Sequence, residues 1–293
     1  MNYTKENPLK VLSLGGGVQS SVIALMIAKG ELPMIDAAIF ADTGHEPRFT
    51  RIFNPRDGTW IEGGIYGWLD WLQTQVPFPI YRVSAGDLAK DSLIIKKSKV
   101  KGKIYTRSFI PAFISKPNGK RGILARKCTR DYKIRPIYRK IKEILGCKYG
   151  PKTIHCITMI GISCDEAHRQ KPSGVPYISN LWPLIDKGMD RKACIQWIND
   201  NNYPIPTRSA CTFCPFHGDE EWIRLKNESP EDFKLVVKFE KDLQETLSHD
   251  EILKGIPYLH SSCVPISEVV LKDLSSHQQV NNFGNECEGM CGV

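Results

Sequence analysis

The 293-residue chain is predicted to be an α/β protein with a parallel sheet flanked by helices. Two observations at its start lead to this fold class. An apolar run at residues 10–14 ends in three glycines, and a helix-like segment at residues 19–29 follows it. Gly30 then ends that segment, and a second buried strand is expected at residues 35–40. Strand, glycine turn, helix and strand in this order open a parallel α/β sheet.

The remaining elements are expected from the same signals. Aromatic and apolar residues at helical spacing predict a helix over residues 66–75. Pro136 should lie near the start of a later helix or kink it. The full set of later elements is a strand at 80–83, a helix at 128–145, a core strand at 153–162, a helix at 190–201 and a helix from 229 toward 247. Prolines and glycines predict a loop or lid at 96–122. The tail from about residue 250 carries few signals of a helix or a strand.

Composition narrows the class of protein. With 41% hydrophobic residues, 11 Phe, 10 Tyr and 6 Trp, the chain can build a core, which excludes wholesale disorder. No apolar stretch is long enough to span a membrane, and the N-terminus lacks the apolar segment of a signal peptide. We therefore expect a cytoplasmic protein with no membrane partner. In a reducing compartment its ten cysteines favour metal binding or catalysis over disulfides.

The net charge of +8 is concentrated in one segment. From Lys96 to Lys142 there are 17 Lys and Arg residues and one acid, Asp131, whereas the rest of the chain has 23 basic and 31 acidic residues. Four aromatic residues are interleaved with this charge: Tyr105, Phe109, Phe113 and Tyr132. A solvated face without a partner is one explanation, but the excess favours a polyanion, either nucleic acid (tRNA or DNA) or a multiply phosphorylated nucleotide.

The glycine turn is the first candidate site. Its sequence, Ser-Leu-Gly-Gly-Gly-Val-Gln-Ser-Ser at residues 13–21, follows a strand and opens a helix. Free N–H groups and the helix dipole at such a turn bind phosphate, and glycines let the backbone approach it. The spacing fits neither the Walker motif nor the G-x-G-x-x-G fingerprint, and a purely structural turn is the alternative. The candidate phosphate contacts are Ser13, Gly15, Gly16, Gly17, Gln19, Ser20 and Ser21.

This turn resembles the PP-loop, SGGxDS, of the ATP pyrophosphatases. Gly16, Gly17 and Ser20 match, whereas Gly15 stands in place of Ser and Gln19 in place of Asp. The resemblance implies a Rossmann-like adenine nucleotide α-hydrolase fold that binds ATP, with magnesium as a companion ion. Because Gln carries no charge, it puts a metal role at position 19 in doubt.

Two further segments resemble the phosphoadenosine phosphosulfate (PAPS) reductase-like branch of that superfamily. Asp42-Thr43-Gly44 ends the second strand, where open α/β sheets bind their ligands, and is similar to the branch's DTG segment. The segment from Gly161 to Arg169, with Glu166 in its acidic part, is similar to a later motif. The resemblance covers about residues 10–220. It adds to the implied nucleotide site Asp42, Thr43, Gly44, Gly161, Glu166 and Arg169.

Three cysteines form the candidate metal site. Cys211 and Cys214 are spaced as CxxC, which can bind one metal ion or two irons of a cluster. Cys128 stands where adenylylsulfate reductases of this branch have a tandem Cys-Cys, with Thr129 in place of the second cysteine. The resemblance implies a [4Fe–4S] cluster on Cys128, Cys211 and Cys214. Zinc, with His217 as a fourth ligand, and the absence of any metal are the alternatives.

The end of the chain carries two more cysteines. Cys287 and Cys291 each match part of the Glu-Cys-Gly segment with which sulfonucleotide reductases attack sulfur. The resemblance implies that one completes the metal site while the other carries sulfur or exchanges a disulfide. The alternative is a frayed tail with two incidental thiols.

These features predict two domains and one favoured function. Residues 1–205 would form the nucleotide-binding α/β domain, with the basic loop 96–122, and residues 206–293 a CxxC-containing, Cys-rich helical extension. The favoured function is adenylation of a substrate with ATP, releasing pyrophosphate, for sulfur transfer onto a nucleic-acid base. A sulfur-donor or thiol-reductant protein would be its partner. The alternatives are a reductase of PAPS or adenylylsulfate and a non-catalytic, zinc-stabilised nucleic-acid-binding module.

Overall fold

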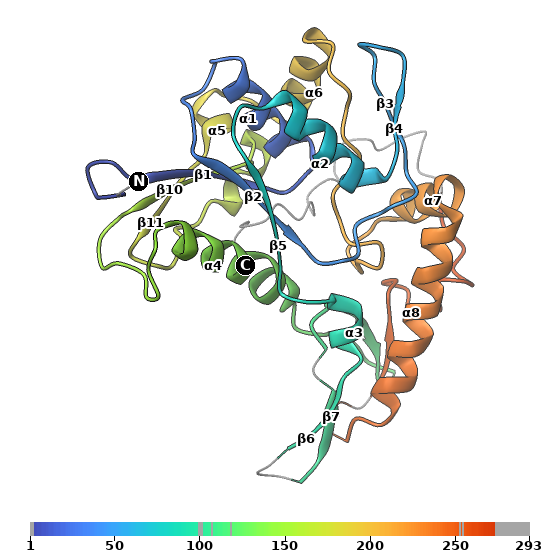
Figure 1. Cartoon of the computed structure of the whole chain (residues 1–293). Coiled ribbons are helices and arrows are strands. Elements are labelled where there is room, and N and C mark those ends of the chain that lie inside the picture. Colours follow the sequence, from blue (N-terminus) through green and yellow to red (C-terminus); the bar gives the residue numbers. More distant parts are fainter. Residues whose placement is uncertain are drawn as a thin grey trace.

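A five-stranded parallel sheet forms the centre of the protein, in a Rossmann-like arrangement with helices flanking it (Figure 1). The computed structural model describes residues 3–98, 102–106, 108–117, 119–251, 253 and 255–272. The strand order is β5-β2-β1-β10-β11, and every neighbouring pair is parallel. The strands are β1 (Leu9–Leu14), β2 (Ala37–Asp42), β5 (Ile80–Ser84), β10 (Cys156–Ile160) and β11 (Ile178–Leu181). The predicted α/β class and the predicted strands are confirmed.

Alternating side chains divide this sheet into two buried faces. Leu12, Leu14 and Phe40 enter one hydrophobic core, and Val11 and Ile39 enter another. Because successive side chains of a strand point to opposite faces, apolar runs without alternation are expected when both faces are covered. The first core is completed by α1 (Val18–Ala28), α2 (Gly64–Gln75), α5 (Pro183–Asp186) and α6 (Arg191–Asp200), and the second by α4 (Arg135–Ile144).

The starts of α6 and α4 differ in their local chemistry. The Asp190 side chain caps α6, with its carboxylate accepting from Ala193 N at 2.7 Å. Pro136 lies in the first turn of α4, but the backbone before it is already helical, so the proline accompanies a change of helix type and not a free helix end. A π-helical turn, η1 (Thr129–Ile134), precedes α4, so the predicted helix at 128–145 is confirmed with a change of helix type at its start.

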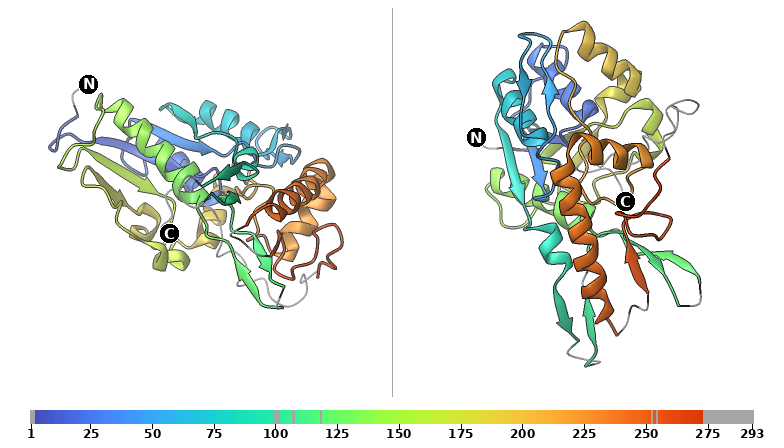
Figure 2. Two further views of the ribbon diagram at one scale, coloured as in Figure 1. Left: turned by 90° about the horizontal axis from the view of Figure 1, so that it is seen from below. Right: turned by 90° about the vertical axis from the view of Figure 1, so that its right-hand side faces the viewer.

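A third core joins the C-terminal part to the middle of the chain. It packs Trp222 of α7 (Asp219–Glu228) and Val236 of α8 (Pro230–Ser248) against Leu88 and Tyr132. Leu88 begins α3 (Leu88–Ser92). Residues on both sides of position 205 therefore share one core, and the C-terminal part includes segments from the basic region as well (Figure 2).

The segment expected to be a loop or lid at 96–122 instead contains paired strands. β6 (Ile95–Lys97) pairs with β7 (Ile104–Thr106), and β8 (Phe113–Ser115) pairs with β9 (Arg121–Ile123) and with β12 (Ile256–Tyr258). β-branched and aromatic residues favour these strands. Gly102 and Gly119, at φ +67° and +76°, supply the turns of the two hairpins, so glycines that indicate a loop in the sequence join strands here.

A third short hairpin, nearer the N-terminus, was not predicted either. It consists of β3 (Ile52–Phe53) and β4 (Trp60–Ile61) and lies between β2 and α2. A 3₁₀ turn, η2 (Cys164–Arg169), follows β10. None of the helices in the described ranges is both long and apolar enough to cross a membrane.

One buried carboxylate ties the C-terminal helices to the loop after β2. Asp232, 1% exposed, accepts from Arg48 N at 3.0 Å, Phe49 N at 3.2 Å and Ser229 Oγ at 2.6 Å. Asp232→Ala leaves these donors unpaired, and should lower the free energy of unfolding by about 2 to 3 kcal/mol. Urea unfolding followed by circular dichroism measures this. Asp242→Ala, on the same helix but in an exposed pair with Lys238, should cost under about 0.5 kcal/mol. Equal losses in both variants would contradict the proposed role of Asp232.

Candidate functional site

The carboxyl ends of the central strands bring the predicted nucleotide segments together. β1 lies between β2 and β10, with Leu14 opposite Phe40 and Ser13 opposite Ile160. The glycine turn, the DTG segment and the segment from Gly161 therefore leave the sheet side by side. The strand order reverses between β1 and β10. Open α/β sheets bind their ligands at the carboxyl edge beside such a reversal.

The glycine turn has the geometry of a strand-to-helix anion site. Gly16 has φ +82°, a conformation that favours glycine, and a Cβ there would lie 3.2 Å from Ile65. Gly15 N donates to Ser20 Oγ at 3.1 Å, and Ser21 Oγ accepts from Trp68 Nε1 at 3.0 Å. The first turn of α1, all of it described, has no acidic residue and no side-chain cap. No side chain of this turn therefore neutralises the positive end of the helix dipole, which its free amide groups form.

Ser13 adds a polar group to this turn. It is the penultimate residue of β1 and is 1% exposed, and its Oγ has no hydrogen-bond partner among the described residues. Gly17 is buried as well, as the N-cap of α1. A buried hydroxyl without a partner is uncommon, and at this edge it is available to a ligand.

Gln19, Glu166 and Arg169 form one buried polar network. Gln19 Nε2 donates to Glu166 Oε2 at 3.3 Å and to Ser163 Oγ at 3.4 Å, and its Oε1 accepts from Arg191 Nη1 at 3.0 Å. Glu166 also forms an ion pair with Arg169. These predicted ligand contacts thus bind one another and join α1 to η2 and α6. Gly161 is buried just beyond β10.

The DTG segment is held in a tight turn. Asp42 Oδ1 accepts from Gly44 N at 2.7 Å and from Tyr66 OH at 2.9 Å. Burial and the Asp42 charge raise the pKa of Tyr66, so this hydroxyl stays protonated and donates. Gly44 has φ +83° with open space where a Cβ would be, and Thr43 is fully buried.

His45 follows this turn and is oriented by an acid. Its Nε2 lies 2.6 Å from Asp87 Oδ1. Burial opposes ionisation of Asp87, but hydrogen bonds from His45 and from Lys90 N prevail and lower the pKa of Asp87 to about 2. Asp87 is therefore a carboxylate throughout the neutral range.

The CxxC segment packs directly on the DTG segment. Cys211 Sγ lies 3.0 Å from Thr43 Oγ1, Thr212 N donates to His45 O at 2.8 Å, and Ser209 Oγ donates to Glu46 Oε2 at 3.1 Å. Ser209 Oγ is also 3.7 Å from the position of a Cβ on Gly16. These contacts bring the cysteine segment to both halves of the predicted nucleotide site.

All three predicted metal ligands line one pocket. Cys128, Cys211 and Cys214 surround it together with Thr43 and the buried Lys133. Burial raises the pKa of the Cys211 thiol, and the nearby Glu46 adds to this, while Lys133 opposes it. In the absence of a bound cation, Cys211 is therefore a protonated thiol at neutral pH.

The donor chemistry suits a soft metal, but the side chains do not form a ready-made site. Within the described ranges, no three His, Cys, Asp or Glu side chains are close enough together to hold a metal ion. The cluster and the zinc ion therefore stay predictions. His217 donates through Nε2 to Cys211 O at 2.9 Å and packs its ring against Trp222. Burial lowers the pKa of His217 to about 4, so it is neutral.

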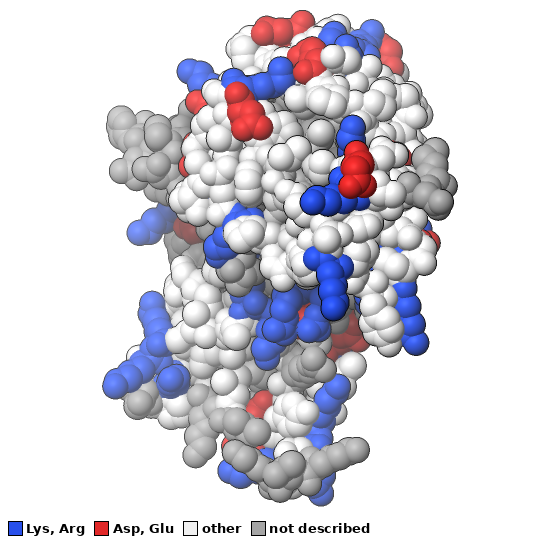
Figure 3. All heavy atoms as spheres, turned by 90° about the vertical axis from the view of Figure 1, so that its left-hand side faces the viewer, with Lys and Arg blue, Asp and Glu red and all other residues white. Residues whose placement is uncertain are grey.

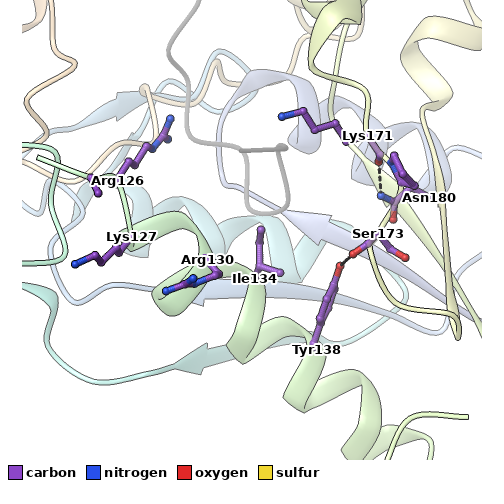
Figure 4. Close-up of a pocket in the computed structure, with 10 residues that line it drawn as sticks. Arg126, Lys127, Arg130, Ile134, Tyr138, Lys171, Ser173 and Asn180 are labelled. Atoms are coloured by element: carbon purple, nitrogen blue, oxygen red, sulfur yellow. Dashed lines mark hydrogen bonds between the residues drawn. The ribbon is translucent and has the colours of Figure 1, made fainter. Parts of the chain in front are cut away.

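A basic pocket of about 450 Å³ adjoins the cysteine pocket. Figure 4 shows Arg126, Lys127 and Arg130 on one side of it and Lys171 and Asn180 on the other. None of the described residues that line it is acidic, and Arg126 lines both pockets. Tyr138 closes its base by donating to Ser173 O at 2.5 Å. Lys and Arg side chains gather on the lower half of the face seen in Figure 3. The pocket suits a phosphorylated ligand.

Cys287 and Cys291 lie outside the described residues, as do Lys99, Lys101 and Arg107 of the basic segment. The predictions for these residues stay untested.

Comparison of this chain with protein-family models, curated proteins and solved structures gives no match.

Several residues at this edge were not singled out from the sequence. Ser209 and Arg126 gave no pattern of their own, because their importance comes from neighbours far along the chain. Lys171 and Asn180 come from outside the basic segment, and neither stands out by charge or spacing. The β3–β4 hairpin carried a usable signal, since residues of high strand propensity, Ile52-Phe53 and Trp60-Ile61, flank an Asp-Gly turn.

The metal assignment predicts a specific pattern of metal loss. Protein purified without oxygen should be brown and contain iron and labile sulfide. Cys128→Ala and Cys211→Ala should each lower the iron content several-fold because thiolates are the expected ligands. Cys194→Ala, in the sheet core, should keep the metal. Elemental analysis and visible absorption measure this. Zinc without labile sulfide would favour the zinc alternative, and no metal would remove both.

Proposed function

We propose that the carboxyl edge of the sheet binds ATP and adenylates an oxygen of a nucleic-acid base, which sulfur then replaces. The observation that carries this proposal is the packing of the CxxC segment on the DTG segment, beside the glycine turn. Cys211 Sγ lies 3.0 Å from Thr43 Oγ1, and Ser209 Oγ lies 3.7 Å from the position of a Cβ on Gly16. A phosphate-binding turn and reactive sulfur chemistry would then share one site.

The glycine turn supplies the groups that a departing pyrophosphate needs. The amides of the first turn of α1 point along the positive end of the helix dipole, and Ser13 Oγ is available to donate. Donors fixed before the reaction stabilise charge that develops in the transition state. The phosphates would lie over residues 15–18, and the adenosine would extend toward the DTG segment.

The chemistry removes a poor leaving group in two steps. The base oxygen attacks the α-phosphorus of ATP, the bond to the bridging oxygen breaks, and pyrophosphate leaves. Hydrosulfide then attacks the activated carbon, AMP leaves with the oxygen, and loss of a proton gives the thiolated base. Where a persulfide-bearing donor protein supplies the sulfur instead, its terminal sulfur attacks the carbon, and a thiol reductant then cleaves the S–S bond that joins the base to the donor and is itself oxidised to a disulfide. The buried Lys133 and the neighbouring Arg126 place positive charge beside the cysteine pocket, where anionic sulfur would be stabilised.

The basic pocket would hold the acceptor. Because Arg126 lines both pockets, a phosphate bound there lies against the cysteine pocket. Lys127 and Lys171 form no ion pair with any described residue, so their charges are available to a ligand. Arg130 shares Asp131 with Arg135 and is partly neutralised.

Replacing one glycine should remove nucleotide binding. Gly16→Ala puts a Cβ 3.2 Å from Ile65 and 3.5 Å from Phe40 beneath the turn and forces a left-handed residue at φ +82°, so the turn must change shape. ATP affinity, measured by isothermal titration calorimetry, should fall by roughly tenfold or more, which is about 1.4 kcal/mol.

Gly30→Ala is the matched control for backbone strain. Gly30 has φ +77° with nothing within 4 Å of a Cβ, and lies at the far end of α1. This variant should lose about 1 kcal/mol of stability and keep its ATP affinity. Unchanged ATP affinity in Gly16→Ala would remove the PP-loop assignment. Thiol-dependent sulfite release from PAPS without ATP would establish the reductase instead.

Nucleic-acid binding should depend on the basic pocket and on salt. The double variant Lys127→Gln with Lys171→Gln removes two pocket charges. The slope of log affinity against log salt should flatten by about 0.7 to 0.9 for each phosphate that is no longer neutralised. Filter binding with bulk tRNA and with duplex DNA measures this. Lys29→Gln with Lys192→Gln, on the exposed surface, is the charge-matched control and should leave the slope unchanged. ATP affinity should stay constant in both, and identical slopes would exclude the pocket as the acceptor site.

A further inference from the structure

The β3–β4 hairpin exposes an unusual set of aromatic side chains. Phe49 is 54% exposed, Phe53 is 49% exposed and Trp60 is 52% exposed. Among the described residues, Tyr149 is the other large aromatic side chain exposed to this degree. Three aromatic rings within twelve residues are costly to leave in water, which points to an interaction surface.

Burial in and just before β3 runs partly against what folding alone would favour. Residues 49, 51 and 53 are exposed, and residues 50, 52 and 54 are buried, following the two-residue period of an extended chain. The exposed side therefore presents Phe, Arg and Phe, whereas the buried side holds Ile52 together with two polar residues, Thr50 and Asn54, at 2% and 3% exposed. A strand selected only for stability would place its aromatic rings inward and its polar residues outward.

The two strands form an aromatic pair with a cation over it. Phe53 lies directly opposite Trp60, with ring centroids 5.4 Å apart in an edge-to-face arrangement. The guanidinium of Arg51 lies 4.9 Å from the centroid of the Trp60 ring and forms no ion pair within the described part of the chain. Rings that meet edge to face keep faces open to a third aromatic group.

Local charge favours a negatively charged partner. Arg48, Arg51 and Arg56 lie in residues 48–61, where Asp57 is the acid nearest to the hairpin turn. Asp57 is used within that turn, where it accepts from Asn54 Nδ2 at 3.0 Å and Thr59 N at 3.0 Å. Arg56 donates to Asn202 O and Arg48 to Gly44 O, so Arg51 is the arginine of this segment best placed to meet a phosphate. Exposed aromatic rings beside an arginine match the stacking platforms that bind single strands.

The hairpin is also connected to the candidate site. Figure 1 shows it standing out from the body between β2 and α2, directly after the DTG segment. Arg48 Nη2 donates to Gly44 O at 3.2 Å, so the base of the hairpin contacts the DTG turn. The turn of the hairpin lies at the other end of the helices, because Arg56 donates to Gln75 Oε1 at 3.2 Å and to Asn202 O at 3.1 Å, where α2 and α6 end.

We propose that residues 48–61 bind unpaired nucleobases of a single-stranded nucleic acid by stacking on Phe49, Phe53 and Trp60. The statement that this nucleic acid is the acceptor of sulfur rests on the proposed function. The binding itself does not, because it needs neither ATP nor the cysteines. Single-stranded segments, loops or splayed bases would be selected over continuous duplex, whose bases are already stacked.

The test is fluorescence anisotropy with the full chain in the absence of ATP. The probes are labelled single-stranded RNA and DNA oligonucleotides of mixed sequence, about 20 nucleotides long so that they exceed one binding site. Stacking on one ring contributes roughly a five- to hundredfold effect on affinity by alanine substitution. Phe53→Ala and Trp60→Ala should each weaken binding by about that range, and Trp60→Phe should retain most of it. Arg51→Gln should flatten the salt dependence by about 0.7 if it contacts one phosphate.

Tyr149→Ala is the matched control. Tyr149 is 78% exposed and has Lys148 5.6 Å from its ring centroid, so it combines the same kinds of group away from the hairpin. It should leave single-strand affinity unchanged, and circular dichroism should show all variants folded.

The outcomes separate this proposal from the proposed function. Weaker single-strand binding in the hairpin variants, with ATP affinity intact, supports it. No single-strand binding by the native protein, or equal binding by native and hairpin variants, overturns it even where Gly16→Ala abolishes ATP binding. Self-association in sedimentation that Trp60→Ala abolishes, without any nucleic-acid binding, would make the hairpin a protein interface and overturn it as well.

Discussion

The packing of residues 209–212 against the end of β2 is the contact on which the rest of the structure depends. The sheet carries its own two cores, and the C-terminal helices share a third with residues 88–132. Thr212 N donating to His45 O, and Cys211 beside Thr43, join these parts at the carboxyl edge. Asp232 supports the same loop through Arg48 N and Phe49 N. Because the contact is made of short polar bonds in a buried place, it fixes position more than it adds stability.

The path of the basic segment explains how a charge spread over a long segment becomes a local feature. The basic region leaves the sheet after β5, forms the small strands β6 to β9 and returns through η1 and α4. Its return places Arg126, Lys127 and Arg130 opposite Lys171, which comes from the loop before β11. The lysines of β6 are exposed, where screening by salt weakens them. The cations that line the basic pocket are therefore better placed to bind an anion than the lysines of β6.

The sequence predicted the sheet better than it predicted the surface. Mostly apolar runs such as residues 10–14 and 35–40 identify strands buried on both faces, and Asp190 marks a helix start by local chemistry. The strands at 95–123 escaped prediction because each is three residues long and depends on pairing with other segments, as β8 does with the distant β12. The meeting of Cys128 with Cys211 was expected from family resemblance. The polar bonds around them, such as Ser209 to Glu46, depend on tertiary contacts that no spacing encodes.

The side chains around Gln19 explain why glutamine fits at a position where the PP-loop motif has aspartate. Its amide donates to the Glu166 carboxylate and accepts from Arg191, and the side chain is 1% exposed. An aspartate at this position would put a second carboxylate against Glu166 in a buried place, where like charges repel strongly and burial disfavours ionisation. A neutral side chain that both donates and accepts satisfies Glu166 without that cost. The glutamine is therefore matched to the Glu166–Arg169 pair, and the positive charge that a phosphate chemistry requires would come from the helix end and from Lys133 and Arg126 instead.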